Sequence, residues 1–267
     1  MKNTYKLSTV VYLLGLLLLV ACGKDDSITK KPEHLLTKVT SISDNSQSII
    51  NYEYDSNNNL VKSFSESDLG MMETTYVYDD NGRMIQKLYY LNGNLIEKKE
   101  YLRTDTSITE QGYLIGYKNT WIQTEEKRVL NIDKDQNIVK MQYFQMQENN
   151  WVSAFYFLYF WESGNMVKEE FWASSSGKLG TLKNNSTYSN ELIHTMNCTY
   201  DNKNNPNKEI YNLFPTPSSK NNVIKYEQVR DNIIIWESEY YFEYDEKNYP
   251  TKKTDDSWVT YYEYLGQ

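Results

Sequence analysis

Alternating apolar and polar residues, interrupted by short runs of Asp, Asn and Gly, fill the chain from about residue 35 to its end. Six segments align without gaps and repeat one strand–turn–strand pattern. They begin at Tyr54, Tyr78, Ile132, Phe160, Tyr200 and Tyr244 and read YDSNNNLVK, YDDNGRMIQ, IDKDQNIVK, FWESGNMVK, YDNKNNPNK and YDEKNYPTK. No stretch combines a helical period with capping residues. The pattern therefore predicts an all-β protein built as an antiparallel meander.

Turn chemistry supports this prediction. The second residue of the segment is Asp in five of the six, and Asn or Gly stands three residues further on in five of the six. Asp at the start of a type I turn accepts a local backbone N–H, and Asn or Gly tolerates the left-handed backbone that follows. We expect three-residue hairpin loops, with strain or a longer loop at Gln136, which fits poorly. Asn92-Gly93 predicts a two-residue hairpin.

The segments also predict which side chains share a face. The first position and the residue two before it are mostly large and apolar, and alternation places them on one face of the entry strand. The exit strand starts with an apolar residue, at Leu60, Met84, Ile138, Met166, Pro206 and Pro250. Strict alternation predicts that Lys62 shares the face of Leu60, and that Lys252 shares the face of Pro250.

The length of the meander limits its architecture. About 14–18 short strands fit into residues 35–267 at roughly 12–16 residues per strand and turn. A sheet of that size should curl, split or close, so we expect a curved sheet or a flattened barrel, including one with loops folded inward. The alternating positions carry many Lys, Glu and Asn and leave no continuous apolar band, so we do not expect this domain to span a membrane.

Composition shows what the core is made of. Leu, Ile, Val and Phe supply only about one fifth of residues 22–267, near the level of disordered chains. The chain contains 25 Tyr and 6 Trp, so folding depends on burying aromatic rings. The formal net charge of −8 argues against a nucleic-acid partner. With 2 Cys and 2 His, we expect no four-cysteine zinc site, no disulfide framework and no cofactor.

The beginning of the chain has the features of a targeting segment. A basic start precedes an apolar run too short to span a bilayer, which predicts a signal peptide over residues 1–21. The run ends in Leu19-Val20-Ala21-Cys22, which resembles a bacterial lipobox and implies acylation of Cys22. Residues 22–34 then form a flexible tether, and residues 35–267 form a single domain built from repeats.

Two further resemblances concern location. Lys24-Asp25-Asp26 resembles the surface-export signal of Bacteroidota lipoproteins, and Asp26-Ser27-Ile28 resembles the O-glycosylation motif of these bacteria, with Ser27 as the acceptor. They imply an outer-membrane lipoprotein exposed at the cell surface; a periplasm-facing lipoprotein is the alternative.

The best-defined segment, Tyr78-Asp79-Asp80-Asn81-Gly82-Arg83-Met84, resembles the YD repeat of Rhs-type proteins. With the lipobox and the export signal, the repeats resemble Bacteroidota lipoproteins of a domain family of unknown function with a porin-like fold. The resemblance covers nearly all of residues 35–267 and implies an antiparallel β meander. It implies no activity and no catalytic residues.

Catalytic chemistry has little support in the sequence. His194 and Cys198 alternate on one predicted strand face, but roughly 13 Å separates their Cα atoms, too far for a nucleophile–base pair. The carboxylates at Glu53, Glu73, Glu169, Glu170, Glu237, Glu239 and Glu243 cannot be paired from the sequence alone. No phosphate-binding loop, nucleophile elbow or zinc-protease motif is present. We therefore expect no enzymatic activity, with a hydrolase as the remaining enzymatic alternative.

Binding chemistry is better represented. The stretch 155–161 is apolar on both strand faces, so one face should bury and the other needs a cover or a partner. The binding candidates are Tyr156, Tyr159, Trp161 and Trp172, with core packing as the competing interpretation. A second aromatic surplus lies at residues 240–244. We expect a membrane-anchored binding or adhesion module for a glycan, a peptide or a partner lipoprotein; a purely structural envelope protein is the alternative.

Overall fold

The computed structural model describes residues 34–266, apart from 68–69, 175–189, 209 and 211–216. Residues His34–Gln267 form one compact unit. The predicted signal peptide over 1–21, the lipidation site Cys22, the export signal Lys24, Asp25 and Asp26, and the acceptor Ser27 all lie outside the described residues.

Within the described part of the chain, seventeen strands form one sheet. The strands are β1 (Leu36–Ser43), β2 (Ser46–Tyr54), β3 (Leu60–Ser67), β4 (Gly70–Tyr78), β5 (Met84–Leu91), β6 (Asn94–Arg103), β7 (Ser107–Ile115), β8 (Trp121–Ile132), β9 (Ile138–Gln147), β10 (Asn150–Glu162), β11 (Asn165–Ala173), β12 (Glu191–Tyr200), β13 (Val223–Arg230), β14 (Ile233–Glu239), β15 (Tyr241–Tyr244), β16 (Pro250–Thr254) and β17 (Val259–Tyr264). A short 3₁₀ turn, η1 (Tyr117–Asn119), joins β7 to β8. No helix in the described residues is long and apolar enough to cross a membrane.

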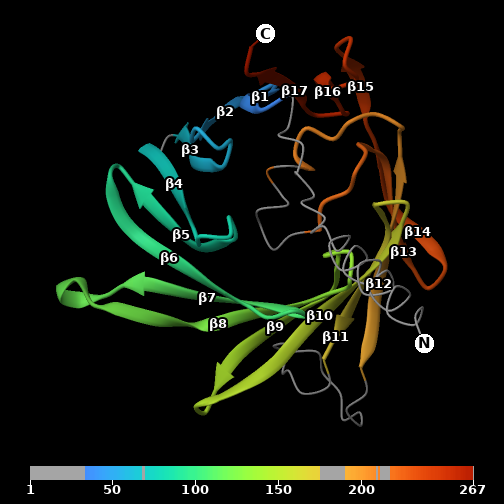
Figure 1. Cartoon of the computed structure of the whole chain (residues 1–267). Helices are drawn as coiled ribbons and strands as arrows, with labels where there is room; N and C mark the ends of the chain where they lie inside the picture. Colours follow the sequence, from blue (N-terminus) through green and yellow to red (C-terminus); the bar gives the residue numbers. More distant parts are fainter. Residues whose placement is uncertain (1–33, 68–69, 175–189, 209, 211–216, 267) are drawn as a thin grey trace, which may run out of the picture. The chain divides into compact units, whose positions relative to one another are not determined.

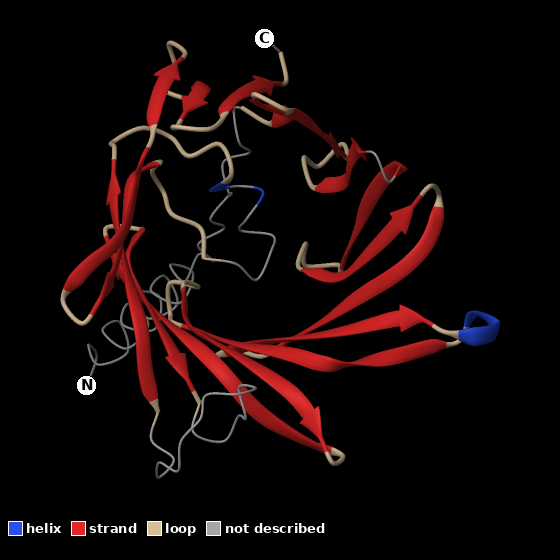
Figure 2. Ribbon diagram, turned by 180° about the vertical axis from the view of Figure 1, so that it is seen from behind, coloured by secondary structure: helices blue, strands red, loops and turns tan. Residues whose placement is uncertain are grey.

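The sheet returns on itself as a nearly closed barrel (Figure 1, Figure 2). Each described strand pairs antiparallel with the next, except β14 with β15, and β17 pairs antiparallel with β1. Strands β14 and β15 are two halves of one pass, interrupted only at Tyr240. β13 pairs with the first half and β16 with the second. When β14 and β15 are counted as one pass, the barrel has an even number of passes, which a barrel closed by antiparallel pairing requires. The predicted all-β meander and barrel are confirmed.

The predicted turn chemistry is confirmed at four of the segments. In the first, the Asp55 carboxylate accepts the backbone N–H groups of Asn57 and Asn59, at 2.8 and 2.9 Å. Asn58 is left-handed, with φ 65°. The loops that start at Asp79, Asp133 and Asp245 repeat this arrangement. Gln136 occupies the left-handed position of an ordinary-length loop with φ 64°, so the strain is present and the longer loop is not.

One insertion shows which face of the sheet is the inside. The described residues between β12 and β13, which are 201–208, 210 and 217–222, leave the wall and lie within the ring in Figure 1. Ile210 of this insertion packs against Leu36, Leu60 and Tyr264. These side chains therefore face the lumen, and so do the alternating tyrosines around them, including Tyr52 and Tyr54. A barrel with loops folded inward was among the architectures expected from the sequence, and this insertion is such a loop.

Aromatic side chains tie neighbouring segments together on this inner face. The hydroxyl of Tyr54 donates to the Leu36 carbonyl at 2.8 Å, and that of Tyr78 to the Leu60 carbonyl at 2.7 Å. The same kind of bond runs from Trp161 to Ile138, from Tyr200 to Met166 and from Tyr264 to Pro250. Four of the five acceptors belong to the first residue of a strand, and Met166 is the second residue of β11. A polar tip thus satisfies a backbone carbonyl while the ring fills the core. The tyrosine excess thus has a structural role.

A β-bulge recurs at the start of the exit strands and changes which of their side chains face the lumen. Tyr54 pairs with Leu60, but Glu53 pairs with Lys62, so one extra residue is inserted between the two pairs. Lys62 consequently points outward while Leu60 points into the lumen. The register shifts at Tyr78, Ile132 and Tyr244 have the same effect. The prediction of a shared face was wrong, because strict alternation does not hold across a bulge.

The outward lysines form ion pairs with carboxylates on adjacent strands. Lys62 lies 2.6 Å from Glu73, and Lys252 lies 2.7 Å from Glu243. Lys38 and Glu263 also join adjacent strands on the outer face. Three more outer-face pairs lie within single strands: Lys98 with Glu100, Lys168 with Glu170, and Lys225 with Glu227. Charge pairs therefore follow the outer surface around much of the barrel.

Two segments depart from the repeat. Around Gly164 the loop contains only Ser163 and Gly164, with φ of 51° and 81°, and Trp161 pairs with Met166. Trp161, not Phe160, therefore occupies the inward first position, and Phe160 lies outside with 39% of its surface exposed. In the fifth segment no strand starts at the buried Pro206, because the inserted loop intervenes before β13.

Candidate binding pocket in the barrel lumen

The inserted loop is fixed at its base by Asp201, the last turn-forming Asp before the insertion. The Asp201 carboxylate accepts the backbone N–H of Lys203 at 2.9 Å and that of Asn222 at 3.1 Å. The Asn222 side-chain amide also donates to this carboxylate, at 3.1 Å, and to the Asn204 carbonyl, at 3.0 Å. The repeat's turn chemistry therefore closes a much longer loop here, because Asn222 takes the place of the residue after the turn.

The far end of the loop is fixed to β11 and β12. Ser219 accepts the backbone N–H of Met166 at 3.1 Å and shares a hydrogen bond of 2.8 Å with the Tyr200 hydroxyl. Asn165 and Asn221 exchange two hydrogen bonds, of 2.9 and 3.0 Å. Residues 217–222, the described end of the loop, are thus fixed against the wall and form an inner wall of the lumen.

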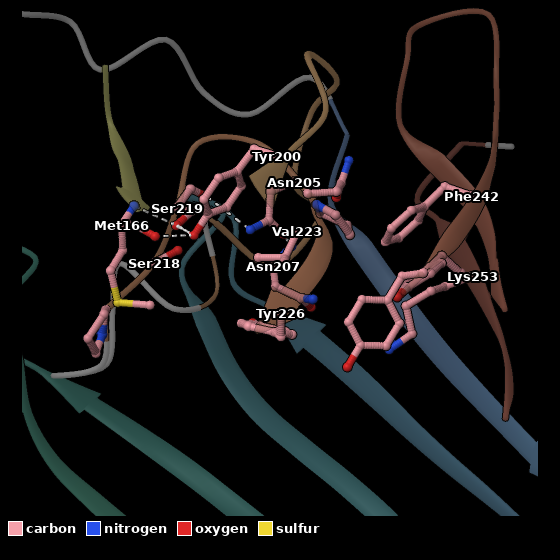
Figure 3. Close-up of a pocket in the computed structure, with 15 residues that line it drawn as sticks. Met166, Tyr200, Asn205, Asn207, Ser218, Ser219, Val223, Tyr226, Phe242 and Lys253 are labelled. Atoms are coloured by element: carbon pink, nitrogen blue, oxygen red, sulfur yellow. Dashed lines mark hydrogen bonds between the residues drawn. The ribbon is translucent and has the colours of Figure 1, made fainter. Parts of the chain in front are cut away.

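Between this inner wall and strands β13–β17 lies a cavity of about 330 Å³, drawn in Figure 3. Its lining residues are Met166, Tyr200, Asn205, Pro206, Asn207, Pro217, Ser218, Ser219, Asn222, Val223, Tyr226, Tyr240, Phe242, Lys253 and Tyr262. In the view of Figure 3, Asn207 and Tyr226 lie between the Tyr200–Ser219 corner and the pair Phe242 and Lys253. The volume is that of a small-ligand site.

Aromatic rings form the barrel side of the cavity. Tyr240 and Phe242 alternate along one pass, so both point inward while Tyr241 between them points out. The rings of Tyr226 and Tyr240 meet edge to face, with centroids 5.8 Å apart. Tyr262 of β17 completes this side. The cavity therefore presents a concave aromatic surface.

Polar groups form the opposite side, and some have no protein partner. The Ser218 hydroxyl oxygen is buried without a hydrogen bond in the described structure. The Asn207 side-chain amide likewise forms none with the described residues, whereas Asn205 is engaged by Ser219 and Asn207 main-chain atoms. On the barrel side, Lys253 of β16 places its ammonium 4.7 Å from the Tyr240 ring centroid. Donors and acceptors thus remain available for a ligand.

A second lumenal feature is a charged cluster on β6–β8. Arg128 donates to both carboxylate oxygens of Glu110, with 2.7 Å for the Nε bond, and Lys99 lies 3.4 Å from the same carboxylate. Burial opposes ionisation of Glu110, but Arg128 outweighs it and lowers the pKa of Glu110. Burial lowers the pKa of Lys87 nearby to about 8. Because Arg128 and Glu110 neutralise and hydrogen-bond each other, we assign this buried pair a structural role.

The four residues predicted for binding do not come together. Tyr156 and Trp172 lie on the outer face as a stacked pair, with ring centroids 6.0 Å apart and an interplanar angle of 3°. Tyr159 and Trp161 point into the lumen; Tyr159 is buried, and Trp161 donates to the Ile138 carbonyl at 2.8 Å. Lys140 and Lys168 lie over outer rings of this hairpin, 4.7 Å from the Tyr156 centroid and 3.9 Å from that of Phe160. The outer aromatic face is therefore partly covered by lysines.

The residues weighed for catalysis, Cys198, His194 and the acids, lie in surroundings that do not activate a nucleophile. Cys198 is buried on the lumenal face of β12, where burial raises its pKa to about 11. Burial also lowers the pKa of His194. Of the acids singled out in the sequence, Glu169 faces the lumen, and burial raises its pKa. The described residues contain no group of three or more His, Cys, Asp and Glu that could hold a metal ion.

Comparison with known proteins gives a distant likeness. No protein-family model and no curated protein matches the chain. The fold is similar to a porin-like protein from Bacteroides vulgatus, with 8% identity, a TM-score of 0.42, and coverage of 88% of this chain and 100% of that one. A porin-like protein from Bacteroides uniformis shows 10% identity and a TM-score of 0.40, covering 86% and 96%. A protein of unknown function from Bacteroides fragilis shows 13% identity and a TM-score of 0.30, covering 55% and 89%.

Proposed function

We propose that this protein is a lipid-anchored cell-envelope β-barrel that binds a saccharide in its lumenal pocket. The observation that carries the proposal is the pairing of the aromatic surface of Tyr226 and Tyr240 with the unpartnered polar groups of Ser218 and Asn207. A sugar ring offers apolar C–H faces to aromatic rings and hydroxyls to amide and hydroxyl side chains. The same cavity has room for about one or two sugar rings.

The envelope location rests on the start of the chain and on the outer surface of the barrel. The lipobox resemblance at Cys22 implies an anchor of two or more acyl chains, which holds a protein stably at a membrane. The outer ion pairs, such as Lys62–Glu73, would be costly against lipid and favour a barrel that stands in water beside the membrane. Membrane fractionation tests this placement: Cys22→Ala should release the protein from the outer-membrane fraction, and its retention there would refute lipid anchoring.

Ligand binding is tested with a fragment of residues 23–267, which retains the whole compact unit. Thermal-shift screening against host and plant glycans should raise the melting temperature with at least one of them. Tyr240→Ala should weaken that glycan at least about tenfold, whereas Tyr241→Ala, its outward neighbour, should leave the affinity unchanged. No shift with any glycan, or equal losses in both variants, would refute saccharide binding in the lumen.

We infer that binding is not followed by catalysis. Glycoside hydrolysis uses a pair of carboxylates flanking the scissile bond, and no Asp or Glu is among the described residues that line the pocket. The raised pKa of the buried Cys198 thiol also disfavours nucleophilic attack. Mass spectrometry of the bound glycan after prolonged incubation should recover it unchanged, and the appearance of hydrolysis products would establish an enzyme.

A further inference from the structure

The charge of the lumenal pocket differs from that of the protein as a whole. The chain carries a formal net charge of −8. Among the described residues that line the pocket, Lys253 is the one ionisable cation, and none is Asp or Glu. The described lining of the pocket is therefore positive in a protein that is negative overall, which favours an anionic group on the ligand.

The bulge in β16 decides which of two adjacent lysines faces the pocket. Lys252 points outward and lies 2.7 Å from Glu243, whereas Lys253 pairs with Phe242 and points into the pocket. No ion pair to Lys253 occurs among the described residues; its ammonium rests over the Tyr240 ring at 4.7 Å. Asp255 acts electrostatically on Lys253, and its carboxylate already accepts the N–H groups of Ser257 and Trp258.

Burial makes the isolated ammonium costly. It lowers the pKa of Lys253, with only partial compensation from Asp255. An anion beside the ammonium would offset this cost and supply the missing acceptor. The buried Ser218 hydroxyl, which has no partner, and the free Asn207 amide could donate to the same ligand.

We propose that the pocket selects an acidic saccharide, with its anionic group bound by Lys253 and a sugar ring against Tyr226 and Tyr240. This inference rests on the proposed saccharide binding and adds the ligand class. The anionic group is a carboxylate, as in uronic acids, or a sulfate ester, and both would accept hydrogen bonds from the Lys253 ammonium.

Three sets of probes test the inference by isothermal titration of the 23–267 fragment: uronic-acid oligosaccharides, their carboxyl-reduced neutral counterparts, and sulfated oligosaccharides. At least one acidic set should bind about tenfold or more tightly than the neutral set. Lys253→Met should remove this preference, and Lys252→Met, the matched control on the outer face, should preserve it. Melting temperatures of both variants confirm that they are folded.

Salt dependence gives a measurement that needs no variant. Affinity for the acidic probe should fall severalfold between 50 mM and 500 mM NaCl, and affinity for a neutral probe should stay constant. Neutral and acidic probes binding equally, or an acidic preference that survives Lys253→Met, would overturn the anion inference while leaving saccharide binding intact. Failure of every saccharide to bind would overturn both proposals.

Discussion

The hydroxyl of Tyr264 gives the most direct test of the aromatic anchoring that holds the repeats together. It donates to the Pro250 carbonyl at 2.8 Å, and both residues are buried. Tyr264→Phe keeps the ring and its packing but leaves this carbonyl without that donor. The variant therefore isolates the polar tip from the apolar body of the side chain.

The expected cost follows from the burial of the acceptor. A buried carbonyl deprived of its donor costs about 1–2 kcal/mol, and the retained ring adds no cavity term. For a domain of this size, that loss lowers the melting temperature by about 3–6 °C. Burial raises the pKa of Tyr264, so the hydroxyl stays protonated and the effect should be constant from pH 6 to 9.

Urea unfolding of the 23–267 fragment measures the difference, with Tyr261→Phe as the control. Tyr261 precedes Tyr262 on the same strand but points outward and is 42% exposed. Its variant should change the unfolding free energy by less than about 0.5 kcal/mol. If Tyr264→Phe proves no more destabilising than Tyr261→Phe, the hydroxyl–carbonyl bonds do not stabilise the barrel.

Three further predictions concern stability. Glu110→Gln should cost about 3 kcal/mol in urea unfolding, because it leaves the Arg128 guanidinium inside the lumen without its carboxylate; a loss below about 1 kcal/mol would contradict a buried pair. Asp133→Ala should cost about 1 kcal/mol in urea unfolding, because two hydrogen bonds to backbone N–H groups are lost. Asp135→Ala, two residues later in the same turn, should cost almost nothing, and equal losses would contradict the turn assignment. Burial raises the pKa values of several lumenal tyrosines above their unfolded value of about 10. Their contribution to folding stability is therefore fully present below about pH 10 and should fall as the pH rises above it. Unchanged stability at about pH 11, measured by circular dichroism, would refute their burial.

The parts of the fold that depend on neighbouring residues could be predicted from the sequence. Asp55 and Asn58 specify their turn through bonds within five residues, so the loop type and the strand count followed from the repeat. The outward direction of Lys62 could not, because a bulge depends on how two strands pair and leaves no clear mark in the alternation. Closure of β1 on β17 joins opposite ends of the domain and is likewise invisible to local pattern.

The pocket was accessible to sequence reasoning only in part. The aromatic surplus at Tyr240 and Phe242 was recognised, and both residues line the cavity. Strict alternation from Pro250 predicts that Lys252 faces inward and Lys253 outward, whereas the bulge turns Lys252 outward and Lys253 into the pocket. Ser218 and Asn207 lie in an insertion whose inward path depends on contacts with distant strands, so nothing in their own neighbourhood indicated a site.

A crystal structure of the 23–267 fragment with its tightest-binding saccharide tests the central claim most directly. We predict density for the sugar inside the lumen, with a ring against Tyr226 and Tyr240 and an anionic group within hydrogen-bond distance of the Lys253 ammonium. Saccharide density on the outer Tyr156–Trp172 stack, with none in the lumenal pocket, would contradict it.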